Sequence, residues 1–262
     1  MKKIIFIIGL GAVVFFLLPF LNKEPLTDLY KDKQTEVGKE VIEYKTETHL
    51  HSKESNYDGK VSVGNIINLY KEKGYSTIIE TPHVSERHFT RVGIEWNEFI
   101  DYLYSSYNIA KYIEGFNYLF AIELTLTSNN NDYLIYGVTE EFLKENEFLY
   151  NISLSELVNL CTKNNFLIVQ PHPFRDGYEI DSVEYKMPFE RYNGQYSAEN
   201  HNDLAEEYFQ ENNLTGLSGS DFHEISDLAR GGIITTKEIL TINDYIEVVL
   251  KNDFTIIRSE ED

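Results

Sequence analysis

The stretch VQPHPFR, residues 169–175, indicates how the chain folds, because a strand-like segment ends there on a histidine. The run from Phe166 to Val169 leads into it and is typical of a buried strand. His172 then stands between two prolines. Two interpretations are open: a capped strand end shaped by the prolines, or an imidazole aimed at a site. The rest of the chain decides between them.

Composition narrows the class of protein. The chain has 262 residues, 42% of them hydrophobic, which suits one large domain with a substantial core and excludes a disordered chain. The formal net charge of −20 argues against a protein that grips nucleic acid through a broad basic surface. Bound metal ions can still attract a small phosphorylated substrate. The single cysteine, Cys161, excludes an internal disulfide and a cysteine-type zinc finger.

The N-terminal segment differs in kind from the rest. Two lysines precede an uncharged apolar run at 4–21, which as a helix would span about 27 Å, close to the thickness of a bilayer core. A cleaved signal peptide is the alternative, but no small-x-small site follows the run. We therefore predict an N-terminal hydrophobic helix that acts as a single-pass membrane anchor over 1–21. A polar linker over 22–40 and a domain over 41–262 follow, and the short basic start favours a domain outside the cytoplasm.

From about residue 41 the chain alternates segments typical of strands and of helices. In 61–74, apolar residues recur at helical spacing and Gly74 provides a stop. Further helices are predicted at 95–114, 154–165, 202–213 and 246–253. Strands are predicted at 41–51, 75–83, 117–126, 132–138, 166–173, 215–223 and 254–259. This βα order predicts a parallel sheet or barrel, with long connections at 84–94 and 175–200 that are typical of loops over an active site.

Imidazoles and carboxylates stand at several of these strand ends. In a parallel βα array such ends converge on one face, where proteins of this class build sites. Residues i and i+2 of a strand point to the same side. His49 and His51 can therefore face one point, and so can Asp221 and His223. The side chains concerned are His49, His51, His83, Glu123, His172, Asp221 and His223. His172 is therefore interpreted as one member of a shared site.

The mixture of ligand types favours Zn, Mn or Fe over Ca or Mg. A carboxylate such as Glu123 can bridge two ions, and ions about 3.5–4 Å apart can clamp a phosphoryl group and activate water. Each of these motifs, taken alone, also has a structural interpretation. An isolated H-x-H motif is weak evidence for metal binding, and a Ser-Asp pair before a helix is often an N-cap. The conjunction favours a metal site, because five of the seven histidines lie at strand ends. His88 and His201 are placed outside it.

Together, these blocks resemble the PHP (polymerase and histidinol phosphatase) superfamily. In chain order they are ETHLHSKESNYDG (47–59), GYSTIIETPH (74–83), AIELTL (121–126), VQPHPFR (169–175) and GLSGSDFHEISDLARGGI (216–233). The resemblance covers about residues 44–235, and its most specific element is the final Gly-Ser-Asp-x-His block. It implies a distorted (βα)7 TIM-like barrel with a centre of two, or at most three, divalent ions that hydrolyses phosphoesters.

The resemblance also implies roles for individual residues. His49, His51, Glu123 and Asp221 would hold one ion, Glu123 and His172 would contribute to a second, and Asp58, His83 and His223 would hold a third. Asp221, Glu123 and His172 would be the catalytic residues. Arg175 and Arg230, which follow ligand blocks, would contact the substrate phosphate.

The chain departs from the family pattern at three points. Glu47 stands where an Asp commonly precedes H-x-H, and Pro82 replaces the Asp before His83. Many three-metal members carry another histidine between the Glu and Pro-His-Pro blocks, but none lies there in this chain, including the region of Thr139. The second metal position is left with two named ligands.

The predicted function is a membrane-anchored, metal-dependent phosphoesterase that uses a metal-activated water on a phosphomonoester or phosphodiester. Two alternatives remain: another metallohydrolase reaction, such as deacetylation, and a non-catalytic binding or regulatory domain with an incomplete metal site. The sequence contains no kinase P-loop, no dinucleotide-binding G-x-G-x-x-G and no serine nucleophile elbow. It names neither the substrate nor the oligomeric state.

Overall fold

The structure, a computed structural model, describes residues 42–259 apart from 176 and 179. The predicted membrane anchor at 1–21 and the linker at 22–40 lie outside these residues. Among the helices that are described, none combines the length and the apolar character needed to cross a membrane.

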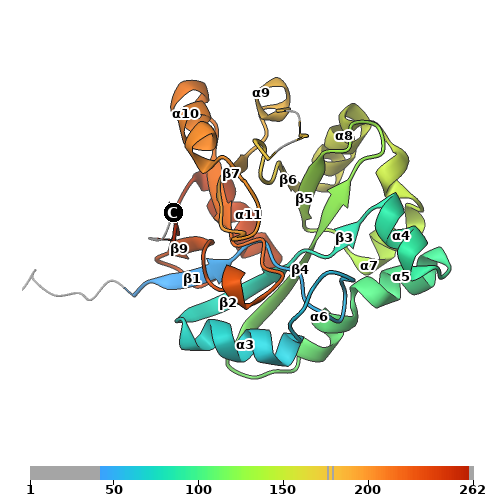
Figure 1. The fold of residues 1–262 in the computed structure, drawn as a ribbon, viewed down its shortest axis with the longest axis horizontal. Coiled ribbons are helices and arrows are strands. Elements are labelled where there is room, and N and C mark those ends of the chain that lie inside the picture. Colours follow the sequence, from blue (N-terminus) through green and yellow to red (C-terminus); the bar gives the residue numbers. More distant parts are fainter. Residues whose placement is uncertain (1–41, 176, 179, 260–262) are drawn as a thin grey trace, which may run out of the picture. The chain divides into compact units, whose positions relative to one another are not determined.

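A curled mixed sheet forms the centre of the fold (Figure 1). Its strand order is β10-β9-β1-β2-β4-β5-β6, and the short β3 pairs with β4. The strands are β1 (Tyr44–Glu47), β2 (Tyr75–Glu80), β3 (His83–Val84), β4 (Asn117–Thr125), β5 (Asp132–Tyr136), β6 (Leu167–Val169), β9 (Ile233–Thr235) and β10 (Thr255–Ile256).

A second, two-stranded sheet lies beside the first. It consists of β7 (Phe189–Asn193) and β8 (Gly216–Gly219), which run parallel. Isolated parallel bridges, Leu50 to Phe222 and Gln170 to Phe189, link the segments that follow β1 and β6 to this pair. The arrangement is a curled half-barrel that is compatible with a PHP-like barrel.

The main sheet is not wholly parallel, which corrects the prediction. β1, β2 and β4 run parallel, but β5 is antiparallel to both β4 and β6, and β9 is antiparallel to β1. The physical reason lies in the connection between β4 and β5, residues 126–131. A connection this short can close a hairpin but cannot hold the crossover helix that parallel neighbours require.

The helices form where the sequence places a buried face, and several lie around the outside of the curled sheet in Figure 1. The predicted α3 (Val63–Glu72) is confirmed, and Gly74, with φ of 79°, follows it in the left-handed region. α8 (Leu154–Asn164) starts with a capping box formed by Ser153 and Glu156. Further helices are α7 (Glu140–Glu145), η1 (Leu149–Asn151), α10 (Asn202–Asn212), η2 (Ile225–Asp227) and α11 (Ile242–Lys251).

Two predictions about helices and loops were wrong in detail. The helix predicted over 95–114 is divided into α5 (Trp96–Leu103) and α6 (Ser105–Ala110). At the break the Ser105 hydroxyl oxygen lies 2.6 Å from the carbonyl oxygen of Tyr102 and 2.7 Å from that of Glu54, so its single proton can be donated to either. The connections at 84–94 and 175–200 are not simple loops either, because they contain α4 (Glu86–Val92) and, respectively, α9 (Ser182–Tyr185) with β7.

Candidate metal centre

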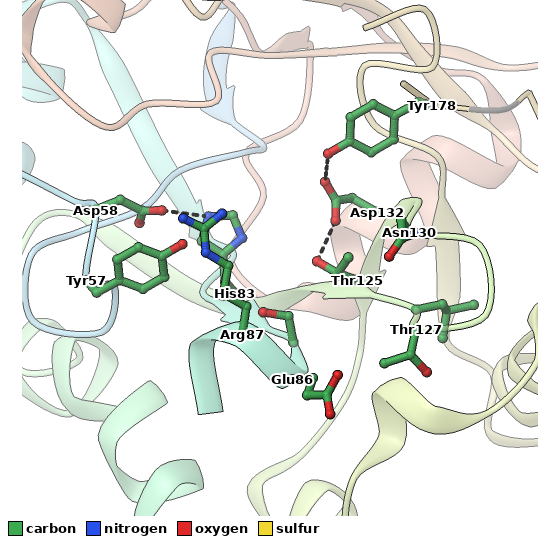
Figure 2. Close-up of a pocket in the computed structure, with 12 residues that line it drawn as sticks. Tyr57, Asp58, His83, Glu86, Arg87, Thr125, Thr127, Asn130, Asp132 and Tyr178 are labelled. Carbon is green, nitrogen blue, oxygen red and sulfur yellow. Dashed lines mark hydrogen bonds and ion pairs between the residues drawn. The ribbon is translucent and has the colours of Figure 1, made fainter. Parts of the chain in front are cut away.

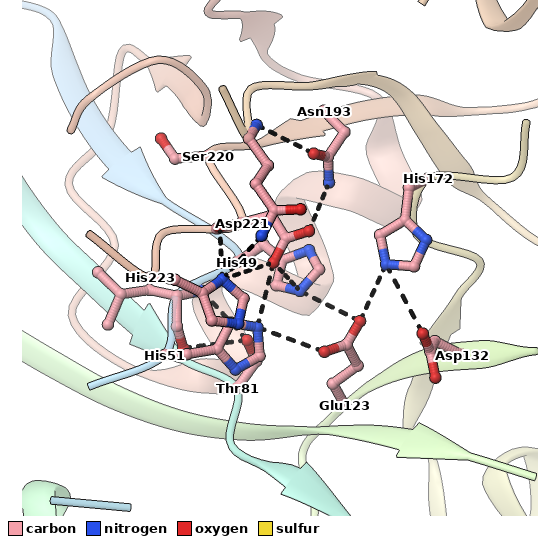
Figure 3. Close-up of polar contacts among 12 residues, drawn as sticks. His49, His51, Thr81, Glu123, Asp132, His172, Asn193, Ser220, Asp221 and His223 are labelled. Carbon is pink, nitrogen blue, oxygen red and sulfur yellow. Dashed lines mark hydrogen bonds and ion pairs between the residues drawn. The ribbon is translucent and has the colours of Figure 1, made fainter. Parts of the chain in front are cut away.

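The structure brings the predicted metal-ligand side chains together at one edge of the sheet; Asp58 and His83 are labelled in Figure 2 and the others in Figure 3. They come from the end of β4 and from segments that follow β1, β2, β6 and β8, as the strand-end reasoning predicts. They are His49, His51, Asp58, His83, Glu123, His172, Asp221 and His223. Their roles as ligands remain predictions, whereas their proximity is an observed feature of the fold.

Backbone pairing holds the first and last ligand segments against each other. The N–H of His51 donates to the carbonyl of Phe222 at 2.9 Å, and the N–H of Phe222 donates to the carbonyl of His49 at 3.3 Å. The buried Glu47 carboxylate accepts the N–H of His49 at 3.1 Å and that of Ser220 at 2.9 Å. Glu47, a departure from the family pattern, therefore ties the two segments together.

Glu123 lies in the middle of the centre. Its Oε1 is 3.3 Å from His49 Nε2 and 3.1 Å from His172 Nε2. Its Oε2 is 3.3 Å from His51 Nε2 and 2.9 Å from His83 Nδ1. One carboxylate thus reaches imidazoles on two sides, which is the geometry that a bridging ligand needs.

Asp221 is the second convergence point. Its Oδ1 is 3.5 Å from His49 Nε2, 3.3 Å from His51 Nε2 and 3.4 Å from His223 Nδ1. Its Oδ2 accepts a hydrogen bond from Arg175 Nη2 at 2.7 Å. The carboxylate is therefore shared between a histidine cluster and a cation.

The donor atoms fit divalent ions. Although buried, His49 Nε2, both ring nitrogens of His51 and Glu123 Oε2 make no hydrogen bond within the described part of the chain. Ligand atoms about 2.1 Å from one ion lie roughly 3.0–3.4 Å from each other, close to the separations above. Within residues 42–259, apart from 176 and 179, three groups have ligand atoms close enough for an ion: His51, His83 and His223; His49, Glu123 and His172; and His49, His51 and Asp221.

The electrostatics of the centre favour a cation. Burial opposes protonation of His49, but Asp221, Glu190 and Glu123 outweigh it and raise the pKa of His49 well above its ordinary value. Burial tends to raise the pKa of Glu123, yet His49 and His83 hold it well below the usual range. Without ions, protons on histidines therefore balance the buried carboxylates, and a divalent ion can take their place.

One histidine behaves differently. Burial lowers the pKa of His51 to about 3, and the neighbouring His83 and His223 add to the effect. Its imidazole is therefore neutral at pH 7, which is the form that binds metal.

His88, placed outside the site by the sequence, is buried, and its Nδ1 lies 2.6 Å from the carbonyl oxygen of His83.

Sequence reasoning missed Glu190, a buried carboxylate on β7. Its Oε1 is 3.0 Å from His49 Nδ1, so the other nitrogen of that ring faces the centre. Its Oε2 accepts the N–H of His172 at 3.1 Å and Asn193 Nδ2 at 2.8 Å. The signal in the sequence is the apolar Phe189 beside it, which lies within the long connection predicted at 175–200.

Sequence reasoning also missed Asp132. It is the first residue of β5, and its Oδ2 lies 3.9 Å from His172 Nε2. The prediction considered only the C-terminal ends of strands. Because β5 runs antiparallel, its N-terminal end lies at the same edge.

The two predicted phosphate-binding arginines lie in different surroundings. Arg175 reaches the centre through Asp221 and also donates to Asn200 Oδ1 at 2.7 Å. Arg230 lines a neighbouring cavity of about 150 Å³. Its Nε donates to the Gly194 carbonyl at 2.9 Å, and its guanidinium lies 5.4 Å from the centroid of the Tyr196 ring.

A polar pocket of about 350 Å³ adjoins the centre. Figure 2 shows Asp58 and His83 on one side of it and Thr125, Asp132 and Tyr178 on the other. Two predicted ligands thus form part of its wall. A small molecule in this pocket would lie against the cluster of donor atoms.

Solved structures share this fold. A two-domain protein from Bacteroides vulgatus that contains a predicted PHP-like metal-dependent phosphoesterase matches with a TM-score of 0.57 and 17% identity, over 84% of this chain and 66% of its own. PsfC from Pseudomonas syringae matches with a TM-score of 0.60 and 12% identity, over 84% of this chain and 93% of its own. The chain has a PHP-like fold. No family model matches the sequence, and the search of curated proteins found no match.

The PHP-like fold confirms the resemblance seen in the sequence at the level of architecture. Among the described residues, the side chains of the His/Glu/Asp clusters come from the quoted sequence blocks. The match covers just under two thirds of the Bacteroides protein's own length.

Proposed function

We propose that the protein is a metal-dependent phosphoesterase of the PHP type. The observation that carries this proposal is the convergence of buried imidazole and carboxylate atoms beside an open polar pocket. Their separations match those of ligands around shared ions, and the PHP-like fold supports the same chemistry. The finer architecture that we propose is the distorted (βα)7 barrel, which the two isolated bridges between the sheets support.

The proposed ligand sets follow the geometry. His49, His51, Glu123 and Asp221 hold one ion, and Asp58, His83 and His223 hold another, with His51 beside them. Glu123 and His172 contribute to the remaining position. Because these sets mix imidazole and carboxylate, Zn, Mn and Fe are the ions expected.

Bound ions of this kind supply charge stabilisation for a phosphoryl group and an activated water as the nucleophile. The chain's own residues do the rest. Glu123 and Asp221 remain ionised, because nearby histidines hold their pKa values well below the usual range. Arg175, with a side chain that is 20% exposed, is proposed to hold a phosphate oxygen, and Arg230 is proposed to assist from its cavity.

The substrate that we propose is a small phosphoester. The pocket volume of about 350 Å³ suits a compact molecule, and the Thr125, Thr127 and Tyr178 side chains offer polar contacts to it. The net charge of −20 disfavours a long polyanion. Membrane anchoring through residues 4–21, with the domain outside the cytoplasm, remains a proposal that rests on their sequence alone.

The test is a substrate panel on the metal-stripped full chain, reloaded separately with Mn, Zn or Fe. We expect phosphate release that depends on the added metal. Asp221→Asn, which removes a charged ligand but nearly keeps the side-chain shape, should abolish it. His201→Ala, outside the centre, should keep most of the activity.

Three outcomes would contradict the proposal. Tight metal binding without turnover of any phosphomonoester or phosphodiester would indicate a non-catalytic metal-binding domain. Turnover of amide or acetyl substrates alone would indicate a different metallohydrolase. An active Asp221→Asn variant would remove this centre from the mechanism.

A further inference from the structure

Asp132 occupies a place that the predicted ligand sets leave open. β5 runs antiparallel to β4, and the register pairs Asp132 with Thr125 and Leu134 with Glu123. The start of β5 therefore lies next to the end of β4, on the same edge as the metal centre. The Asp132 side chain is 9% exposed, so it points into the protein rather than into solvent.

His172 faces two carboxylates at this place, those of Glu123 and Asp132. His172 Nε2 is 3.1 Å from Glu123 Oε1 and 3.9 Å from Asp132 Oδ2, and Figure 3 shows the imidazole nitrogen between the two carboxylates. These two separations from His172 Nε2 are those of ligand atoms on adjacent or opposite sides of one ion, roughly 3.0–4.2 Å for bonds of about 2.1 Å. Glu123 and His172 alone are too few protein ligands for a firmly bound ion.

The Asp132 carboxylate is also held in one orientation. Tyr178 OH donates to its Oδ2 at 2.5 Å, and Thr125 Oγ1 donates to its Oδ1 at 2.5 Å. Ligating carboxylates are typically fixed by such outer hydrogen bonds. Each oxygen retains a further lone pair, so these hydrogen bonds leave Oδ2 able to bind an ion.

We infer that Asp132 is a metal ligand and completes the second ion position with Glu123 and His172. This inference rests on the proposed metallohydrolase function. This site would have two carboxylates and one imidazole as ligands. Another candidate ion group, formed by His51, His83 and His223, has three imidazoles. Carboxylate-rich sites suit Mn and imidazole-rich sites suit Zn. The second position should therefore accept Mn more readily than the imidazole-rich group does. Asp132 also forms part of the wall of the pocket in Figure 2.

The experiment measures metal binding directly. The full chain is stripped with a chelator and titrated with Mn²⁺, and bound ions are counted by elemental analysis after dialysis at fixed free metal. Asp132→Asn should weaken one Mn²⁺ site by more than the roughly 10–100-fold that loss of an outer hydrogen bond causes. The other sites should be unchanged. Tyr178→Phe, which keeps the carboxylate, should weaken the same site by about tenfold.

Controls separate this inference from the proposed function. Asp101→Asn, a carboxylate that is 62% exposed on α5, should bind Mn²⁺ as the wild type does. Asp132→His keeps a ligand but makes the site richer in imidazole, so its preference should move from Mn towards Zn. This second variant decides the question if Asp132→Asn does not fold.

Each outcome has a clear consequence. A folded Asp132→Asn protein that binds the same number of Mn²⁺ ions with the same affinity overturns the inference, as does an unchanged metal preference in Asp132→His. If the wild type binds ions and hydrolyses phosphoesters in that case, the proposed function stands. A wild type that binds no divalent ion would overturn both.

Discussion

Glu190→Gln should weaken metal binding while leaving the protein folded. The Glu190 carboxylate contacts His49 Nδ1 at 3.0 Å through Oε1 and accepts the N–H of His172 at 3.1 Å through Oε2. A glutamine of the same size has only one oxygen, so its NH₂ group must face one of these donors. At least one buried donor is then left without an acceptor, whichever way the amide is turned, because Asn193 Nδ2 also donates to Oε2.

The magnitude follows from these contacts. An unsatisfied buried donor costs about 1–3 kcal/mol. Loss of an outer partner of a ligating histidine typically lowers metal affinity by roughly 10–100-fold, which corresponds to about 1.4–2.7 kcal/mol. The two figures agree, so we expect a loss of this size in metal affinity and a comparable loss in the free energy of unfolding.

The assay is a chelator-competition titration of the stripped protein with Mn²⁺ or Zn²⁺, together with thermal unfolding of the metal-free form. Glu141→Gln, an exposed residue of α7, is the matched control and should change neither quantity. A folded Glu190→Gln protein with wild-type metal affinity would refute the reasoning. It would mean that the orientation of His49 does not depend on Glu190.

Three further predictions concern pH, substrate and location. Because the pKa values of His49 and His83 are raised well above 6.5, both carry protons at neutral pH in the metal-free protein. Metal must displace these protons, so its affinity should rise as pH increases from 6.5 upward, and calorimetry in two buffers should show proton release; a pH-independent affinity would contradict this. Arg175→Ala should raise KM for a phosphoester by roughly 10–100-fold, the value of a charge-assisted contact, and unchanged kinetics would remove it from the site. If residues 4–21 anchor the domain outside the cytoplasm, protease added to intact cells should digest it, whereas full protection would reverse the orientation.

The sequence by itself predicted the parts of the site that depend on local geometry. His49 and His51, like Asp221 and His223, stand two residues apart, and strand-like backbone sends such pairs to one side. The sequence blocks place these pairs and Glu123 at the ends of predicted strands. Where strands pair in parallel, their carboxyl ends lie at the same edge of the sheet. The helices with a clear apolar face, such as α3, were predictable for the same reason, since their periodicity is written in consecutive residues.

Tertiary structure alone decided the residues that complete the centre. Asp132 reaches the centre only because β5 pairs antiparallel with β4. Glu190 reaches the centre only because β7 pairs with β8 in the second, two-stranded sheet. Neither residue belongs to a recognisable local motif, and a charged residue in a short strand resembles a loop residue. Their positions are determined by strand pairing between distant segments, because hydrogen bonds across the sheet, and not neighbours in the chain, fix which side chains face His49 and His172.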